Sequence, residues 1–133
     1  MTELILVRGL HGSGKSTWAQ ALVNADPRII HVEADNYMRE NGKYCYRPEK
    51  ISYVHECCKY DTRRLLEAGR SVVVANTFTR CWEMWPYAMM ALDLGCKFTV
   101  KEMTGNYGSI HNVPEESMEK MRKRWETIDS RWR

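Results

Sequence analysis

The chain has 133 residues, of which 44% are apolar and 28% charged, and this length predicts one domain, residues 1–133, with its own core. Twenty Lys and Arg against seventeen Asp and Glu give a net charge of +3, which excludes the strongly basic class of histone-like nucleic-acid binders. Five cysteines without a Cys-x-x-Cys pair indicate free thiols in a reducing compartment. Because no apolar run approaches the ~18 residues of a membrane span, we expect a soluble, cytoplasmic protein without a membrane partner.

The first half of the chain alternates between predicted strands and helices. Leu4–Val7 is a continuous apolar run typical of a strand buried on both faces, and apolar residues then recur at helical spacing over Lys15–Ala25. Ile29–Val32 predicts a second strand. Residues 35–47 have no clean period, so we expect a loop with one helical turn and a tight turn at Asn41–Gly42.

The second half continues the alternation. A long helix is predicted over Pro48–Ala68, a strand over Ser71–Ala75, and a helix over Trp82–Leu94 that ends at a glycine. Lys97–Met103 alternates as a fourth strand would. From Pro114 an amphipathic closing helix is expected, with one apolar stripe formed by Met118, Met121, Trp125, Ile128 and Trp132.

This order of elements predicts a three-layer α/β fold, with a four-stranded parallel sheet and helices on both faces. Ligands of such folds bind at the carboxyl ends of the strands. In this chain those ends carry Gly9–Ser16, Glu33–Asp35 and Asn76–Thr77, so we expect the chemistry there.

The segment Gly9–Ser16 fits the phosphate-loop pattern Gly-x4-Gly-Lys-Ser/Thr between a strand and a helix. Its backbone N–H groups and the helix N-terminus should face a phosphate chain. Lys15 is expected to reach the β- and γ-phosphates, Ser16 to ligate Mg²⁺, and Thr17 to bind the α-phosphate. The residues predicted to bind ATP are Gly9, His11, Gly12, Ser13, Gly14, Lys15, Ser16 and Thr17.

Beyond this loop, the chain resembles the small P-loop kinases of the polynucleotide kinase type, which move the γ-phosphate of ATP to a 5′-hydroxyl of a nucleic acid. The segments that carry the resemblance are Val7–Ala19, Ala34–Tyr37, Val74–Thr79, His111–Pro114 and Arg124–Glu126. The resemblance implies a P-loop NTPase/kinase fold with strand order 2-3-1-4, ATP and Mg²⁺ as ligands, and a general-base role for Asp35.

Two departures from the family pattern affect the expected chemistry. Ala75 stands where many relatives have an acidic residue that supports Mg²⁺ indirectly. Between Met103 and His111 there are only seven residues, where relatives insert a lid helix that ends in an arginine. Either Arg122 or Arg124 replaces that arginine, or catalysis is weak, or a partner supplies a residue.

The acceptor site has several candidate residues. Asp35 follows the second strand and could accept a hydroxyl proton, with a helix N-cap as the alternative role. Tyr37 and Arg39 begin a segment of interleaved tyrosines and basic residues that suits base stacking and phosphate pairing, or that is simply a solvated loop. Asn76 and Thr77 could contact the acceptor or Mg²⁺-bound water.

Three function classes remain open at this point. The sequence favours ATP- and Mg²⁺-dependent phosphoryl transfer to a nucleotide or to the 5′-hydroxyl of a nucleic acid, with Lys15, Asp35 and Arg124 or Arg122 as catalytic residues. An ATP-binding module without transfer activity and a simple NTPase are the alternatives. Acceptor identity and oligomeric state are left open.

Overall fold

A computed structural model describes residues 2–44, 47–105 and 115–128 of the chain. Its centre is a four-stranded parallel sheet in the order β2-β5-β1-β6. The strands are β1 (Glu3–Arg8), β2 (Ile29–Val32), β5 (Ser71–Asn76) and β6 (Lys97–Glu102). Across the sheet, β2, β5, β1 and β6 are the second, third, first and fourth predicted strands. The expected order 2-3-1-4 is therefore confirmed.

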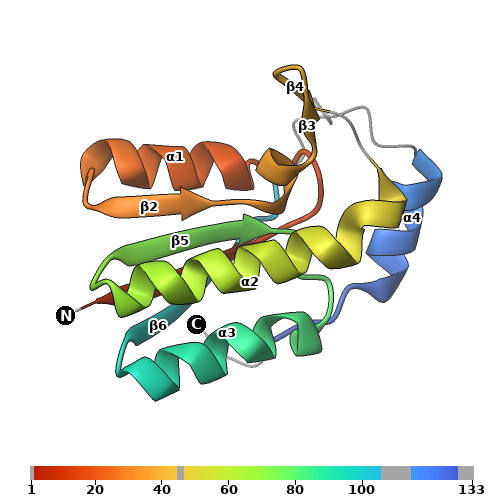
Figure 1. Ribbon diagram of the computed structural model, residues 1–133. Coiled ribbons are helices and arrows are strands. Elements are labelled where there is room, and N and C mark those ends of the chain that lie inside the picture. Colours follow the sequence, from red (N-terminus) through yellow and green to blue (C-terminus); the bar gives the residue numbers. More distant parts are fainter. Residues whose placement is uncertain (1, 45–46, 106–114, 129–133) are drawn as a thin grey trace.

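Helices cover both faces of the sheet (Figure 1). One face packs on α1 (Lys15–Ala25), and the other packs on α2 (Ile51–Glu67) and α3 (Cys81–Leu94). Successive residues of β1 point to opposite faces: Leu4 and Leu6 belong to the core under α2 and α3, whereas Ile5 and Val7 belong to the core under α1. Continuous apolar strands arise because both faces are buried.

The segment between β2 and α2 has more structure than predicted. Its single helical turn is a 3₁₀ helix, η1 (Ala34–Tyr37), and the short strands β3 (Arg39–Glu40) and β4 (Lys43–Tyr44) then pair around the Asn41–Gly42 turn. Positive φ angles of 53° and 79° at these two turn residues match the two-residue hairpin geometry. The long helix that follows begins with a 3₁₀ turn, η2 (Pro48–Lys50), before α2.

The closing helix is shorter than predicted. Helix α4 (Glu115–Arg124) buries Met118 and Met121 as expected, but residues 125–128 leave the helix. Glu126 explains the break, because its backbone N–H donates to the Thr79 carbonyl (2.7 Å) and its side chain accepts from the Cys81 N–H (2.7 Å). Ile128 joins the main core, whereas Trp132 lies outside the described residues. Tertiary hydrogen bonds therefore override the helical periodicity.

A fully buried arginine, Arg8, lies at the carboxyl end of β1. Its Nε and Nη2 donate to the Phe78 carbonyl (3.0 and 2.8 Å), and Nη2 also donates to the Glu126 carbonyl (2.7 Å). The guanidinium lies 3.9 Å from the centre of the Trp125 ring and 3.7 Å from a Glu102 carboxylate oxygen. One side chain thus fastens the loop after β5 and the segment after α4 to the sheet.

In the part of the chain that the structure describes, no helix has both the length and the apolarity needed to cross a bilayer.

We expect Arg8→Met to lower the free energy of unfolding by about 2–5 kcal/mol, because it removes a buried cation and leaves two carbonyls without their donor. Urea denaturation measures the loss as a lower midpoint. The matched control is Arg28→Ala, which removes an exposed arginine paired with Asp26 and should leave the midpoint unchanged. Equal midpoints for the Arg8 variant and the wild type would contradict this role.

Candidate active site

The phosphate loop joins the end of β1 to the start of α1 in a conformation that needs glycine. Gly14 precedes α1 with a φ of 90°, a left-handed conformation that L side chains rarely adopt. At Gly9 the constraint is space, because a Cβ would lie 2.3 Å from the Ser13 hydroxyl and 3.0 Å from the Met103 carbonyl. The α1 N-terminus has no side-chain cap, so its backbone N–H groups face the loop.

Lys15, the first residue of α1, is 5% exposed. Burial disfavours its charged form and lowers the pKa of the Lys15 ammonium, and the carboxylates of Asp35 and Glu33 oppose this effect. The lysine therefore lies close to acidic groups from the end of β2. This is a buried cation next to a loop of N–H donors, the combination that holds a phosphate chain.

Ser16, the predicted Mg²⁺ ligand, contacts a carboxylate that the sequence reasoning gave no role. Its hydroxyl lies 2.7 and 2.8 Å from the two carboxylate oxygens of Glu33, and the His31 imidazole Nε2 lies 3.0 Å from one of them. Burial would raise the pKa of the Glu33 carboxyl, but the hydrogen bonds from His31 and Ser16 and the Lys15 charge hold that pKa below its ordinary value. A serine hydroxyl beside an ionised carboxylate is a set of oxygen donors that fits Mg²⁺.

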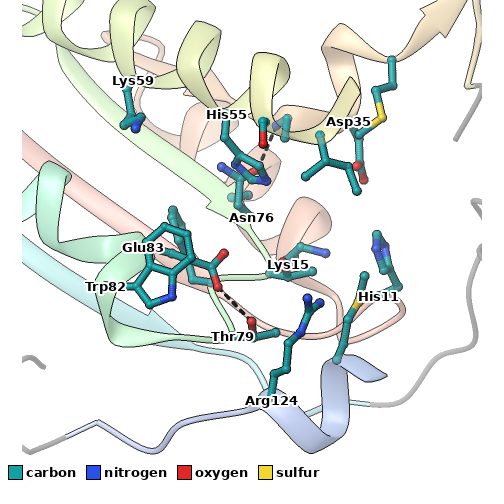
Figure 2. Close-up of a pocket in the computed structure, with 18 of the residues that line it drawn as sticks. His11, Lys15, Asp35, His55, Lys59, Asn76, Thr79, Trp82, Glu83 and Arg124 are labelled. Atoms are coloured by element: carbon teal, nitrogen blue, oxygen red, sulfur yellow. Dashed lines mark hydrogen bonds between the residues drawn. The ribbon is translucent and has the colours of Figure 1, made fainter. Parts of the chain in front are cut away.

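A cavity of about 430 Å³ opens beside the lysine, at the carboxyl ends of the strands (Figure 2). Several predicted site residues line it together: His11, Lys15, Asp35, Asn76, Thr77 and Arg124. Asp35 is 7% exposed and comes from η1, and Figure 2 shows the Arg124 guanidinium pointing toward Lys15. The structure therefore brings the phosphate-loop lysine and the predicted base to one cavity.

Asn76 at the end of β5 also fixes the position of this turn. Its side-chain Oδ1 accepts a hydrogen bond from the Ala34 N–H (2.8 Å), which holds the start of η1 against β5. Thr77 accepts from the Gly9 N–H through its carbonyl (3.3 Å), which links the same strand end to the phosphate loop. Both residues are thus part of the frame of the cavity as well as its lining.

Three further predicted residues, Tyr37, Arg39 and Arg122, lie outside this cavity. Tyr37 donates its hydroxyl to the Asp61 carboxylate on α2, and neither Tyr37 nor Arg39 lines the cavity. Arg122 lines a separate cavity of about 310 Å³ together with Ser13 and Trp125, and its guanidinium is bonded to Glu115 (2.9 Å) and Glu119 (2.8 Å). Of the two candidate arginines, Arg124 is therefore the one in the cavity with Lys15.

Helices α2 and α3 supply lining residues that the sequence reasoning did not assign to the acceptor site. His55 and Lys59 are four residues apart on α2, a spacing that puts them on one helix face, and burial lowers the pKa of His55. On α3, Trp82 lines the cavity and is 72% exposed. Glu83 beside it accepts from the Thr79 hydroxyl (2.9 Å) and the Arg80 N–H (3.0 Å), so it caps α3.

Comparison with known sequences gives a family and two relatives. A family model described as an AAA domain matches residues 4–104. An uncharacterized protein of Pasteurella multocida, PM0531, is 39% identical over 134 residues, which cover 91% of this chain and 75% of that protein. Human NEDD4-binding protein 2 is 29% identical over 139 residues, which cover 96% of this chain but only 8% of that much longer protein.

Solved structures of P-loop kinases and related proteins share the fold. Chaetomium thermophilum Kti12 in complex with ADP-AlF3 has a TM-score of 0.69 at 14% identity, covering 97% of this chain and 84% of Kti12. The Mycobacterium tuberculosis APS kinase CysC has a TM-score of 0.63 at 14% identity, and the match covers 92% of this chain and 96% of the CysC chain. A chain of the Pnkp1/Rnl/Hen1 RNA repair complex has a TM-score of 0.63 at 18% identity, covering 96% of this chain and 40% of that one.

The described fold, the phosphate loop and the family match over most of the chain agree with one another. This chain belongs to the AAA domain family and has the P-loop NTPase fold that small P-loop kinases share.

Proposed function

We propose that the protein is a kinase that transfers the γ-phosphate of ATP to a hydroxyl of a nucleotide or of a nucleic-acid 5′ end. The observation that carries this proposal is the common cavity of Lys15 and Asp35, because phosphoryl transfer needs a phosphate-binding cation and a proton acceptor on either side of the reacting atoms. Bound Mg²⁺, with Ser16 as its protein ligand, would neutralise charge on the phosphates.

The roles of the residues follow from their positions. The backbone N–H groups of residues 9–14 and the Lys15 ammonium hold the phosphates, and Thr17 in the first turn of α1 is the candidate contact to the α-phosphate. The Asp35 carboxylate accepts the proton of the acceptor hydroxyl. At the same time the oxygen of that hydroxyl bonds to the γ-phosphorus, and the bond from the γ-phosphorus to the β,γ-bridging oxygen of ATP breaks, which releases ADP. Arg124 stabilises the charge on the phosphoryl oxygens during this exchange.

The cavity lining supports an anionic, aromatic acceptor. The exposed indole of Trp82 offers a stacking surface for a base, and Lys59 and Lys120 carry positive charge to the same cavity. Lys59 also pairs with Glu56 (2.6 Å) and Lys120 with Glu116 (3.7 Å), so glutamates on the same helices offset part of this positive charge. These features favour a nucleotide or an oligonucleotide end over an uncharged sugar.

A second candidate function is nucleotide binding, with or without ATP hydrolysis, in the absence of transfer. The observation that favours it is Ala75, which is fully buried at the end of β5 and offers no carboxylate at the position where many related kinases have one. In the human relative the matched segment is only 8% of a much longer chain, so a domain of this kind can be one part of a larger protein.

Incubation with γ-labelled ATP and Mg²⁺ tests these functions. We expect label on one class of acceptor among 5′-hydroxyl DNA and RNA oligonucleotides, nucleosides, mononucleotides and APS, the last because an APS kinase shares the fold. Lys15→Ala should lose nucleotide binding, whereas Asp35→Asn should keep it and lose about 10²–10⁴-fold in rate. Free phosphate alone would favour an NTPase, and calorimetric ATP binding without either product would favour a binding module.

The two arginines of α4 give a second, matched test. Arg124→Ala should lower kcat by about 10²–10³-fold, because Arg124 lines the cavity with Lys15. Arg122→Ala should change kcat less than threefold, since Arg122 is bonded to two glutamates of its own helix. The kcat of each variant is measured by steady-state kinetics with the acceptor that the labelling experiment identifies. A larger loss in the Arg122 variant would reverse the assignment.

A further inference from the structure

We propose that Glu33 is the carboxylate that orients the Ser16 hydroxyl toward a nucleotide-bound divalent cation, in place of the acidic residue that is absent at Ala75. The inference rests on the proposed binding of ATP with a divalent cation, but not on the transfer step. It makes Glu33 a positioning residue that acts through Ser16.

The geometry around Ser16 defines this role. A serine hydroxyl has one hydrogen to donate and two lone pairs. Because an ionised carboxylate only accepts, the hydroxyl hydrogen points at Glu33, whose two oxygens lie 2.7 and 2.8 Å away. The lone pairs of the Ser16 oxygen are then directed away from the carboxylate and are available to a cation. A carboxylate that accepts a hydrogen bond from a metal ligand fixes the position of that ligand and increases its electron density.

The sheet register explains how Glu33 replaces a residue of the neighbouring strand. Val32 is paired with Val74 across the β2–β5 ladder, so Glu33 is level with Ala75. In a parallel pair, residues at the same level point to the same face, and Ala75 belongs to the core on the α1 side. A carboxylate at either position would therefore face the start of α1, where Ser16 lies. The chain carries its carboxylate on β2 rather than on β5.

A neighbour on the same strand holds Glu33 in place. His31 lies two residues earlier on β2, on the same face, and its Nε2 lies 3.0 Å from a Glu33 oxygen. Glu33 is 5% exposed and does not line the acceptor cavity, whereas Asp35 does. The two carboxylates at this strand end are thus separated in function: Glu33 faces the cation ligand and Asp35 faces the acceptor.

The test measures cation binding rather than turnover. Mn²⁺ is titrated into the protein–ADP complex and followed by electron paramagnetic resonance, and ADP affinity without metal is measured by calorimetry. Glu33→Gln, which keeps the size of the side chain but not its charge, should weaken Mn²⁺ binding by about 10–100-fold. Metal-free ADP affinity should change less than threefold. Glu67→Gln is the matched control: it makes the same change in an α2 glutamate that pairs with Arg63 (3.5 Å), and it should leave Mn²⁺ affinity unchanged.

A double-mutant cycle separates this role from a merely structural one. If Glu33 acts through Ser16, Glu33→Gln should cause no further loss of Mn²⁺ affinity in a Ser16→Ala background. The Ser16→Ala variant and the double variant should then have the same Mn²⁺ affinity. Urea denaturation midpoints check that all variants fold. If Glu33→Gln does not fold, Glu33→Asp, which keeps the charge but shortens the side chain, takes its place in the cycle.

The outcomes distinguish this inference from the proposed function. Wild-type Mn²⁺ affinity in Glu33→Gln, or wild-type ADP binding that does not respond to Mn²⁺, would overturn the role of Glu33. Normal Mn²⁺–ADP binding that depends on Glu33, without transfer to any acceptor, would support Glu33 and overturn only the kinase activity. Absence of nucleotide binding in the wild type would overturn both.

Discussion

The geometry of the site depends on the contacts of the buried Arg8 guanidinium. Arg8 directly precedes Gly9, and its guanidinium binds the carbonyls of Phe78 and Glu126 while stacking on Trp125. Phe78 has a φ of 46°, a conformation unfavourable for an aromatic residue that these hydrogen bonds help to hold. Because Trp125 directly follows Arg124, the same contact fixes the end of α4 at the cavity. The phosphate loop, the loop after β5 and the candidate charge-stabilising arginine therefore share one anchor.

The burial of Lys15 explains why a bound nucleotide would stabilise this site. Burial lowers the pKa of Lys15, and the nearby carboxylates of Asp35 and Glu33 compensate only in part. Phosphate oxygens would add negative charge and hydrogen-bond acceptors beside the buried ammonium, where electrostatic interactions are stronger than in bulk water. A divalent cation bound with them would in turn balance the carboxylate side, so phosphate and cation are expected to bind more tightly together than separately.

The sequence predicted the elements well because their signals are local. Apolar runs gave the strand over Ile29–Val32 with the bounds the structure has, and helical spacing did the same for Lys15–Ala25. The errors involve contacts between residues far apart in the chain. Trp125 continues a helical stripe but packs on Arg8, which ends the closing helix early. Tyr37 donates to Asp61 on α2 and does not line the cavity, so its contact with an acceptor stays a prediction. Glu33 was placed at a chemically important strand end but received no role of its own, since only the register of β2 on β5 reveals that it faces Ser16.

The separate directions of Glu33 and Asp35 follow from where β2 ends. In a continued strand, residues two apart point to the same face, and both carboxylates would then crowd the start of α1. Strand β2 ends at Val32 instead, and the 3₁₀ turn η1 begins at Ala34, whose N–H is held by the Asn76 side chain. This turn redirects Asp35 into the cavity while Glu33 keeps its strand orientation. Asn76 therefore helps to determine which carboxylate faces Ser16 and which faces the cavity.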